Sequence, residues 1–331
     1  MIMGYFYKKN VLVTGSCGTI GQGLIKKLLQ TDVSQVIGID NNETGLFFQK
    51  QLFGSNKNFR AYYCDIVDPD STRKLIEGVD VVIHAAALKH VTICEDSPVA
   101  AIRNNVVGTQ NIIDACLAND VERMTFTSSD KAVNPTNVMG TTKLLGEKLI
   151  TAAAHMNTAT IFSSTRFGNV LGSSGSVIPI FRQQLKLGVP LTVTHPDMTR
   201  FVMTEEEACE LVLKSVFEAN TGETLVTKMR VMKIMDLALA MHQQIYPEIK
   251  KPEINVVGTK PGEKLYEELT TSEEIRRTTG SGDYLRISSP FQYFPVDETS
   301  EQILDREYIS SNELPMSVDE IKNYLLDNGL S

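Results

Sequence analysis

The sequence lacks tryptophan, any long apolar run and any pair of closely spaced cysteines. No stretch of 18 apolar residues occurs, and Lys8 and Lys9 precede any extended apolar segment, so we expect neither a membrane span nor a signal peptide. The five cysteines are odd in number and widely spaced, which is typical of a reducing compartment and predicts no zinc site: Cys17, Cys64, Cys94, Cys116 and Cys209. We therefore expect a cytoplasmic protein without a metal or a membrane partner.

Basic residues are also in deficit, with 32 Lys and Arg against 40 Asp and Glu and a formal charge of −8. This balance argues against nucleic acid as a partner. The 331 residues are 42% hydrophobic, as is ordinary for a soluble enzyme, and exceed the length of about 150 residues expected for one domain. No internal repeat or Pro/Gly-rich linker is present, so a second domain would fold against the first.

Short β-rich runs alternate with helical spacing through the first half of the chain, which predicts strands at Asn10–Thr14, Gln35–Ile39, Phe59–Cys64, Val79–His84, Glu122–Thr127 and Thr158–Ser164. Strands joined by helical crossovers form a parallel, doubly wound α/β sheet, the Rossmann arrangement. The fourth run is almost continuously apolar, as expected for a strand that is covered on both faces.

After Arg166 the elements become shorter and mixed. Thr204 and Glu207 have the spacing of a capping box and predict a helix start, and a strand at 223–227 would return to the main sheet. We therefore predict a larger domain of residues 1–168 with a returning segment at about 204–245. A smaller, mainly C-terminal domain would comprise residues 169–203 and 246–331.

The first strand leads directly into a GxxGxxG loop that opens a helix, with Gly15, Gly18, Thr19, Ile20 and Gly21 as its candidate ligand-binding residues. Glycines allow the tight turn, and a helix N-terminus offers unpaired amides to a pyrophosphate. This context predicts a dinucleotide site.

Asp40, nineteen positions after Gly21, ends the second strand. Its carboxylate would bind the ribose hydroxyls and repel a 2′-phosphate, and no Lys or Arg lies between it and Lys50, so NAD is favoured over NADP. The alternative is that Asp40 caps the next helix. Asp65 and Ile66 are candidates for the adenine edge, although an Asx turn explains Asp65 equally well.

Longer strings carry a specific resemblance over residues from about 10 to 290. The glycine loop and the strings at 84–90, 129–131 and 139–143 resemble the extended short-chain dehydrogenase/reductases. More narrowly, the chain resembles the UDP-N-acetylglucosamine 4,6-dehydratases of bacterial surface-glycan synthesis, in the strings SSDKAVNP (128–135), RFGNVLGSSGS (166–176), TVTHP (192–196), MTRF (198–201) and KPGEKLYEEL (260–269).

The resemblance implies a lyase in which NAD is reduced and reoxidised in each turnover. C4 of the sugar is oxidised, the C5 proton and the C6 hydroxyl are lost as water, and the hydride returns to C6. It implies a nucleotide-sugar substrate, carried by UDP or GDP, and a homo-oligomer. The larger domain would bind NAD with the help of Ala85 and Ala86, and the smaller domain would bind the nucleotide sugar.

Carried over by position, Ser129 would bind the C4 oxygen, Asp130 would protonate the departing C6 hydroxyl, and Lys131 would be the C5 base. Burial and mutual charge can tune such neighbours. The alternative without a catalytic role is that Asp130 and Lys131 form an exposed turn with a surface ion pair. Lys143 would hold the nicotinamide ribose, a role that rests on the resemblance because a lone helical lysine is normally solvated.

The sequence departs from the wider superfamily at Met139, which replaces the usual catalytic tyrosine four residues before Lys143. A thioether cannot titrate, and no tyrosine occurs between Tyr63 and Tyr246. A methionine here resembles the larger, membrane-anchored and active branch of these dehydratases, so we expect a soluble form of its catalytic domain. The proton acceptor would then be Asp130, Lys131 or a water held by Ser129.

The substrate-binding candidates combine polar groups with the positive charge that a nucleotide diphosphate needs: Lys89, His90, Asn169, Ser176, Arg200 and Glu263. Apart from Glu263 and Lys264, which the resemblance marks, Lys260–Glu268 has mostly helical spacing and is expected to be a solvated face. Two other functions compete with the lyase. One is a nucleotide-sugar C4 epimerase, and the other is an inactive NAD-binding regulatory protein.

Overall fold

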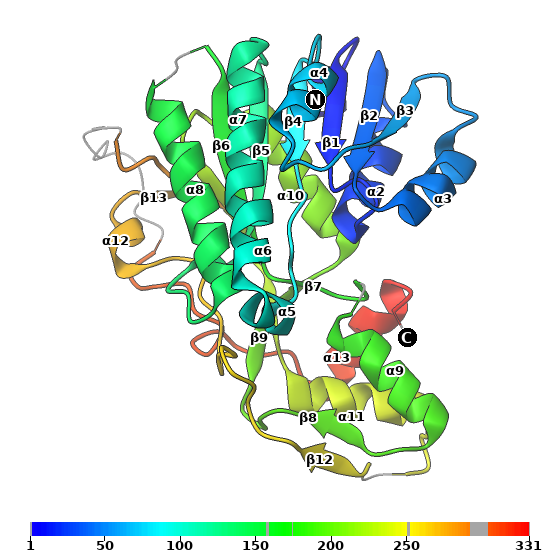
Figure 1. The fold of residues 1–331 in the computed structure, drawn as a ribbon. Coiled ribbons are helices and arrows are strands. Elements are labelled where there is room, and N and C mark those ends of the chain that lie inside the picture. The colour runs from blue at the N-terminus through cyan, green and yellow to red at the C-terminus, as the bar shows by residue number, and fades with distance from the viewer. Residues whose placement is uncertain (1, 157–158, 174, 250–251, 292–303, 331) are drawn as a thin grey trace.

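The computed structural model describes residues 2–156, 159–173, 175–249, 252–291 and 304–330. Its main feature is a nine-stranded sheet of the order β13-β14-β10-β6-β5-β4-β1-β2-β3 (Figure 1). The strands are β1 (Asn10–Thr14), β2 (Gln35–Asp40), β3 (Phe59–Tyr63), β4 (Val81–His84), β5 (Arg123–Ser129), β6 (Ile161–Phe167), β10 (Thr224–Thr227), β13 (Thr278–Ser281) and β14 (Tyr284–Ile287).

The seven strands from β10 to β3 are parallel, which confirms the predicted doubly wound fold. The predicted strand at 223–227 is confirmed as β10, which pairs with β6. Two antiparallel strands, β14 and β13, extend that edge and were not predicted. Thr158, the expected start of the sixth strand, lies outside the described residues.

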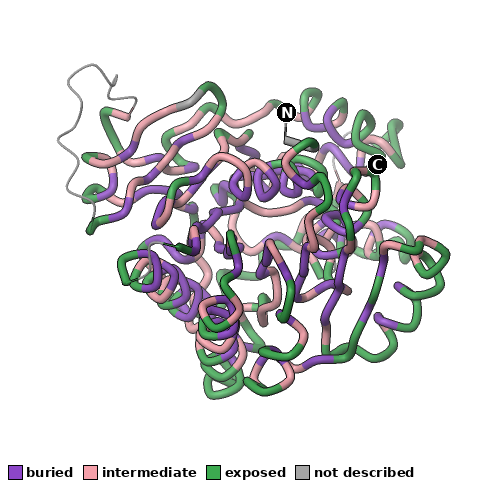
Figure 2. Tube along the Cα trace, turned by 90° about the horizontal axis from the view of Figure 1, so that it is seen from above, coloured by how far each residue is buried: buried purple, intermediate pink, exposed green. Residues whose placement is uncertain are grey.

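Both faces of the sheet are covered. Val11 and Val13 of β1 face one core with α2 (Thr19–Leu28), α3 (Glu43–Phe53) and α10 (Glu205–Glu218). Leu12, between them, faces a second core with α7 (Gly108–Ala118) and α8 (Val138–Met156), and α4 (Pro69–Leu75) packs on α7. This alternation follows from the two-residue period of a strand. Figure 2 shows the buried segments gathered inside the molecule and the exposed turns around them.

A smaller lobe lies beyond the carboxyl ends of the parallel strands (Figure 1). It contains α9 (Val177–Leu187), α11 (Ile234–Ile245) and α13 (Val318–Asp327), which share one apolar core. Its strands are β7 (Asn169–Val170), β9 (Thr199–Met203) and β11 (Arg230–Lys233) in one sheet, and β8 (Leu191–Val193) with β12 (Ile254–Val256) in another.

The predicted returning segment at about 204–245 is divided between the two lobes. Helix α10 begins with the expected capping box of Thr204 and Glu207 and lies on the main sheet. Helix α11 instead packs with α9 and α13 in the smaller lobe. Strands β13 and β14, from the segment expected in the smaller domain, join the main sheet. These placements differ from the predicted boundaries because the chain crosses between the lobes more often than its composition shows.

Short elements complete the fold: α1 (Ile2–Tyr5), α5 (Val91–Asp96), α6 (Pro98–Ile102), the π-helical turn η1 (Arg103–Val107), the 3₁₀ turn η2 (Asp130–Ala132) and α12 (Ser272–Ile275). Within the described ranges, no helix is long and apolar enough to cross a membrane. No cluster of three or more potential metal ligands occurs in that part of the chain.

Candidate active site

A cleft of about 1270 Å³ lies between the carboxyl ends of the parallel strands and the smaller lobe. The glycine loop, the ends of β2, β4 and β5, helix α8 and the start of α9 contribute to its walls. Ligands of doubly wound sheets bind in this position, where the strand order reverses between β1 and β4. The cleft exceeds the roughly 300–1,000 Å³ of a pocket for one drug-sized ligand, so it has room for a dinucleotide together with a second molecule.

The glycine loop has no room for a Cβ atom at two positions. Gly15 has φ of +63°, and a Cβ atom there would lie 2.7 Å from the backbone of Ala86. At Gly21 a Cβ atom would lie 2.2 Å from the Gly15 carbonyl oxygen. Helix α2 then begins after Gly18 with no side-chain cap, so its first amides are available to a ligand. The loop, with Thr19 and Ile20 also lining the cleft, fits a pyrophosphate.

Asp40 lies at the end of β2 and lines the cleft. Its Oδ2 accepts a hydrogen bond from the Cys17 backbone N–H at 2.9 Å, and its Oδ1 accepts one from the Asn42 N–H at 2.9 Å. Helix α3 is capped by the side chain of Asn42, so the alternative of Asp40 as helix cap is wrong. The carboxylate is held at the rim of the dinucleotide half of the cleft.

The strand ends beside Asp40 provide mainly apolar walls. Ile66, Ala85 and Ala86 line the cleft. Asp65 does not, because its Oδ1 accepts from the Val67 N–H at 3.0 Å in an Asx turn. The structure therefore favours the turn for Asp65, and of these two residues only Ile66 lines the cleft.

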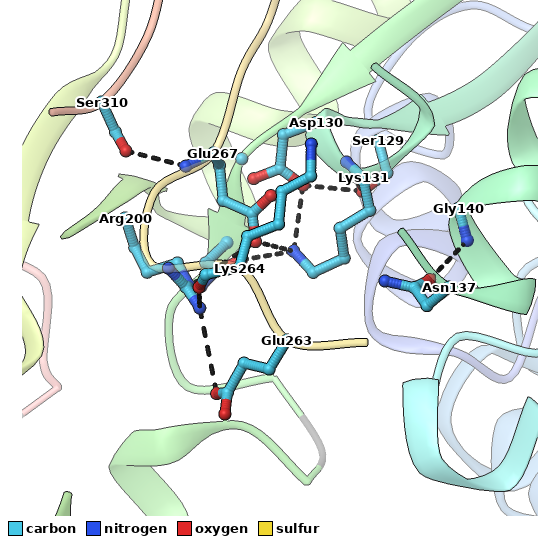
Figure 3. Close-up of polar contacts among 12 residues, drawn as sticks. Ser129, Asp130, Lys131, Asn137, Gly140, Arg200, Glu263, Lys264, Glu267 and Ser310 are labelled. Carbon is cyan, nitrogen blue, oxygen red and sulfur yellow. Dashed lines mark hydrogen bonds and ion pairs between the residues drawn. The ribbon is translucent and has the colours of Figure 1, made fainter. Parts of the chain in front are cut away.

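Ser129, Asp130 and Lys131 end β5 and form the turn η2. Ser129 and Lys131 line the cleft, whereas Asp130 is fully buried behind them. Asp130 Oδ1 accepts hydrogen bonds from Ser129 Oγ at 2.8 Å and from Lys131 Nζ at 3.0 Å, and Oδ2 has no partner among the described residues. The exposed-turn alternative is wrong, since this is a buried ion pair at the cleft wall (Figure 3).

Glu267 belongs to the same cluster and was missed by the sequence analysis. Its Oε1 lies 3.5 Å from Lys131 Nζ and 3.6 Å from Arg200 Nε, and only 2% of Glu267 is exposed. The segment 260–268, expected to be a solvated helical face, is not helical. Lys264 and the backbone of Gly262 instead contact the loop after β5, through the carbonyl of Val133 and the side chain of Asn137.

Lys143 lies on α8 and reaches the cleft from the side. Its Nζ donates to the Thr127 carbonyl at 2.7 Å and lies 4.5 Å from the centre of the Phe126 ring. Burial lowers the pKa of Lys143 to about 8, against the opposing effect of Glu147. Met139, one turn earlier, also lines the cleft and packs in a small apolar cluster with Cys94 and Ala101.

All six substrate-binding candidates line the cleft: Lys89, His90, Asn169, Ser176, Arg200 and Glu263. Ser176 Oγ is buried and has no partner among the described residues, and it precedes the uncapped N-terminus of α9. Arg200 is buried, and it donates to the carbonyl oxygens of Thr199 and Lys264.

Arg166, the first residue of the string at 166–176, does not line the cleft. Its guanidinium forms two hydrogen bonds to Glu147 and two to Glu274 at 2.7 to 2.9 Å, and all three residues are buried. Arg166 therefore holds α8 and α12 against β6. His84 is similarly enclosed between Thr14 and Thr109, and burial lowers its pKa to about 3.

The glycine cradle, the acidic residue after β2 and the lysine of α8 at one cleft define an extended short-chain dehydrogenase/reductase. The family model for polysaccharide biosynthesis protein matches residues 11–289, and the chain belongs to this family. An uncharacterized membrane protein of Methanocaldococcus jannaschii is 47% identical over 82% of this chain and 83% of its own. A UDP-glucose 4-epimerase of Rickettsia canadensis is 36% identical over 97% of this chain and 96% of its own.

Among solved structures, Pen from Bacillus thuringiensis is 37% identical with a TM-score of 0.93, over 99% of both chains. More distant structures that contain NAD, at 20–24% identity and TM-scores of 0.66 to 0.70, share the fold.

Proposed function

We propose that the protein is a nucleotide-sugar 4,6-dehydratase that acts on UDP-N-acetylglucosamine, or on its GDP counterpart, with NAD as a cofactor that is regenerated in each turnover. The observation that carries this proposal is the ion pair between the buried Asp130 and the cleft-lining Lys131, joined to Ser129 at the end of β5. A nucleotide-sugar substrate is supported by the name of the 36% identical epimerase relative.

The dinucleotide half of the cleft fits NAD, because a Cβ atom at Gly15 would fill the cradle and the first amides of α2 have no side-chain cap. Asp40 would bind the adenosine ribose and disfavour a 2′-phosphate. Lys143 would hold the nicotinamide ribose. When bound, NAD would accept the hydride from C4 of the sugar and return it to C6.

The protein itself must move protons. Oxidation at C4 releases the O4 proton, and elimination breaks the C5–H and C6–O bonds while the C6 hydroxyl takes a proton to leave as water. The final step returns a proton to C5. Two protons leave the sugar and two return, so the site stores one proton between oxidation and the last step. Asp130 and Lys131 can hold it, since they share a hydrogen bond at 3.0 Å.

In this proposal Ser129 binds the C4 oxygen, Asp130 supplies the proton for the C6 hydroxyl, and Lys131 removes the C5 proton. Because Asp130 is enclosed, its proton reaches the cleft through Ser129 Oγ or Lys131 Nζ, which both donate to its Oδ1. Asn169, Ser176, Arg200 and the positive charge of Lys89 would bind the sugar diphosphate. A cytoplasmic location and a homo-oligomer remain proposals that rest on the sequence.

A C4 epimerase is the second candidate, and the relative with that name supports it. An epimerase removes and returns one hydride at C4 and one proton at O4, without an acid for C6 or a base for C5. The Asp130–Lys131 pair exceeds that need, and no tyrosine lines the cleft in the described part of the chain. Both features favour the dehydratase.

The test is mass spectrometry of UDP-N-acetylglucosamine after incubation with the purified protein, without added reductant. A product lighter by one water, with no net NADH, is the expected result. An unchanged mass with an epimer detected by NMR would select the epimerase instead. Untouched substrate, with GDP-N-acetylglucosamine also untouched, would leave the NAD-binding regulatory protein.

A further inference from the structure

Glu267 is a buried carboxylate that the proposed reaction has not yet used. Its backbone is fixed on both sides, because its N–H donates to Ser310 Oγ and its carbonyl accepts from the Ser310 N–H, both at 2.9 Å. Ser310 Oγ is in turn 2.9 Å from Thr199 Oγ1, next to Arg200. The strand β9 and the chain around 310 therefore fix Glu267, whose side chain points toward Lys131 (Figure 3).

The Lys131 ammonium lies between two buried carboxylates. Asp130 Oδ1 is 3.0 Å from Lys131 Nζ on one side, and Glu267 Oε1 is 3.5 Å away on the other. Asn169 Oδ1 accepts a third contact at 3.1 Å, so the amine is held from three directions. The side chain of Lys131 still lines the cleft, where it can meet a substrate.

Both carboxylates keep one oxygen without a hydrogen-bond partner among the described residues, namely Asp130 Oδ2 and Glu267 Oε2. A carboxylate that only stabilised the fold would be expected to have its oxygens satisfied, since a buried unpaired acceptor costs about 1–3 kcal/mol. Glu267 thus keeps one buried carboxylate oxygen without a hydrogen-bond partner among the described residues, while its other oxygen faces Lys131 and Arg200.

We infer that Glu267 is a positioning residue of the proposed reaction, which holds the Lys131 amine in place beside Asp130 at the cleft wall and sets a second negative charge against it. This inference rests on the proposed function for its role in turnover. Glu267 touches neither the cleft nor the reacting atoms, so it acts through Lys131.

The charges around Lys131 give the inference its direction. Burial and the positive charge of Arg200 lower the pKa of Lys131. The negative charges of Asp130 and Glu267 outweigh both effects, so the pKa of Lys131 is raised. Burial and the negative charge of Asp130 raise the pKa of the Glu267 carboxyl. The positive charges of Lys131, Arg200 and Lys264 lower it by less, so the pKa is raised overall. Removing the negative charge of Glu267 should therefore lower the pKa of Lys131.

The experiment measures Lys131 directly and needs no substrate. Lysines are labelled with trace acetic anhydride between pH 7 and pH 11, and peptide mass spectrometry compares Lys131 with the exposed Lys57. Only the neutral amine reacts. In Glu267→Gln, the labelling midpoint of Lys131 should fall by about one pH unit or more, the effect of losing an opposite charge within ~4–6 Å.

Two controls separate charge from packing. Glu268→Gln changes the neighbouring carboxylate, which pairs with Lys264 at 2.6 Å, and should leave the Lys131 midpoint unchanged. Glu267→Asp keeps the charge and should restore a midpoint near that of the wild type. NAD binding by each variant reports that the fold is intact.

An unchanged Lys131 midpoint in a folded Glu267→Gln variant would overturn the inference, as would an equal shift in Glu268→Gln. The labelling result does not depend on which reaction the protein catalyses. If the product assay fails but the labelling midpoint of Lys131 still shifts in Glu267→Gln, the dehydratase proposal is refuted and the interaction between Glu267 and Lys131 stands. Where turnover is detected, the limb of the pH profile that belongs to Lys131 should move to lower pH in Glu267→Gln.

Discussion

Met139 and Lys143 lie one helical turn apart on α8 and both line the cleft, but only Lys143 carries a group that can titrate. Met139 is 4% exposed and packs with Cys94 and Ala101. The chain therefore keeps the lysine of the short-chain dehydrogenase/reductases without the phenol that normally accompanies it. In the proposed mechanism the proton acceptor for O4 lies at the end of β5, which packs against this helix.

Substitution of Met139 tests that arrangement. Met139→Tyr should lower the rate of product formation at least about tenfold, because a larger side chain in this packed position costs about 1–3 kcal/mol and the site is organised around another acceptor. Met139→Phe is the matched control, since it has the same ring without the hydroxyl and should be equally slow. A tyrosine variant faster than the phenylalanine variant would show that a phenol can serve in this site.

Asp130→Asn tests the buried pair. The amide keeps the size of the carboxylate but cannot carry the proton, so we expect NAD to bind normally while water loss falls by about 10²–10⁴-fold, the usual contribution of a general acid or base. The product assay and NAD titration measure the two effects. Asp114→Asn on the exposed face of α7 is the control. Full turnover by Asp130→Asn would remove Asp130 from the mechanism.

Much of the fold was predictable because its signals are local. Each parallel strand is a short apolar run followed by a helix, and the glycine loop, Asp40 and the Ser129–Lys131 turn all follow such strands. Carboxyl ends of parallel strands meet at one edge, so sequence order alone brings these residues together. The same reasoning predicted the capping box at Thr204 and the return of β10.

Other parts depend on contacts between distant segments. Glu267 lies 136 positions after Lys131, and its segment has helical spacing without forming a helix, so no local pattern indicates the ion pair. Arg166 belongs to a string that looks like a nucleotide site, yet Glu147 and Glu274 from two other elements enclose it. The division of 204–245 between the lobes was missed for the same reason: both halves are amphipathic, and only packing selects their partners.

Asp40 provides a test of cofactor choice. Asp40→Asn removes the negative charge that would face a 2′-phosphate, while the side-chain oxygen can still accept from the Cys17 or Asn42 amide. The ratio of the dissociation constants for NAD and NADP should shift toward NADP by about tenfold, which corresponds to ~1.4 kcal/mol. Fluorescence titration of both cofactors measures the ratio. An unchanged ratio would mean that Asp40 only holds the glycine loop, through its hydrogen bond with the Cys17 amide, and does not select the cofactor.

The Arg166 cluster predicts how stability depends on pH. Burial raises the pKa of Glu274, but the hydrogen bonds and charge of Arg166 outweigh it and hold the pKa below its usual value. A carboxyl with a lowered folded-state pKa stabilises the fold above its unfolded-state pKa of about 4.3, and this stability is lost as the pH falls through the folded-state value. The contribution should therefore be complete at pH 7 and disappear in acid.

The substitution Glu274→Gln measures this contribution of Glu274 to the stability of the fold. At pH 7 the variant should be less stable than the wild type by about 1–3 kcal/mol in urea denaturation, since Arg166 loses one of two buried carboxylates but keeps Glu147. Between pH 5 and pH 3.5 the difference should shrink, because the wild type loses its advantage as Glu274 takes a proton. Glu273→Gln, at the exposed neighbouring position, should match the wild type throughout. A difference that stays constant with pH would mean that Glu274 acts by packing, without a charge interaction with Arg166.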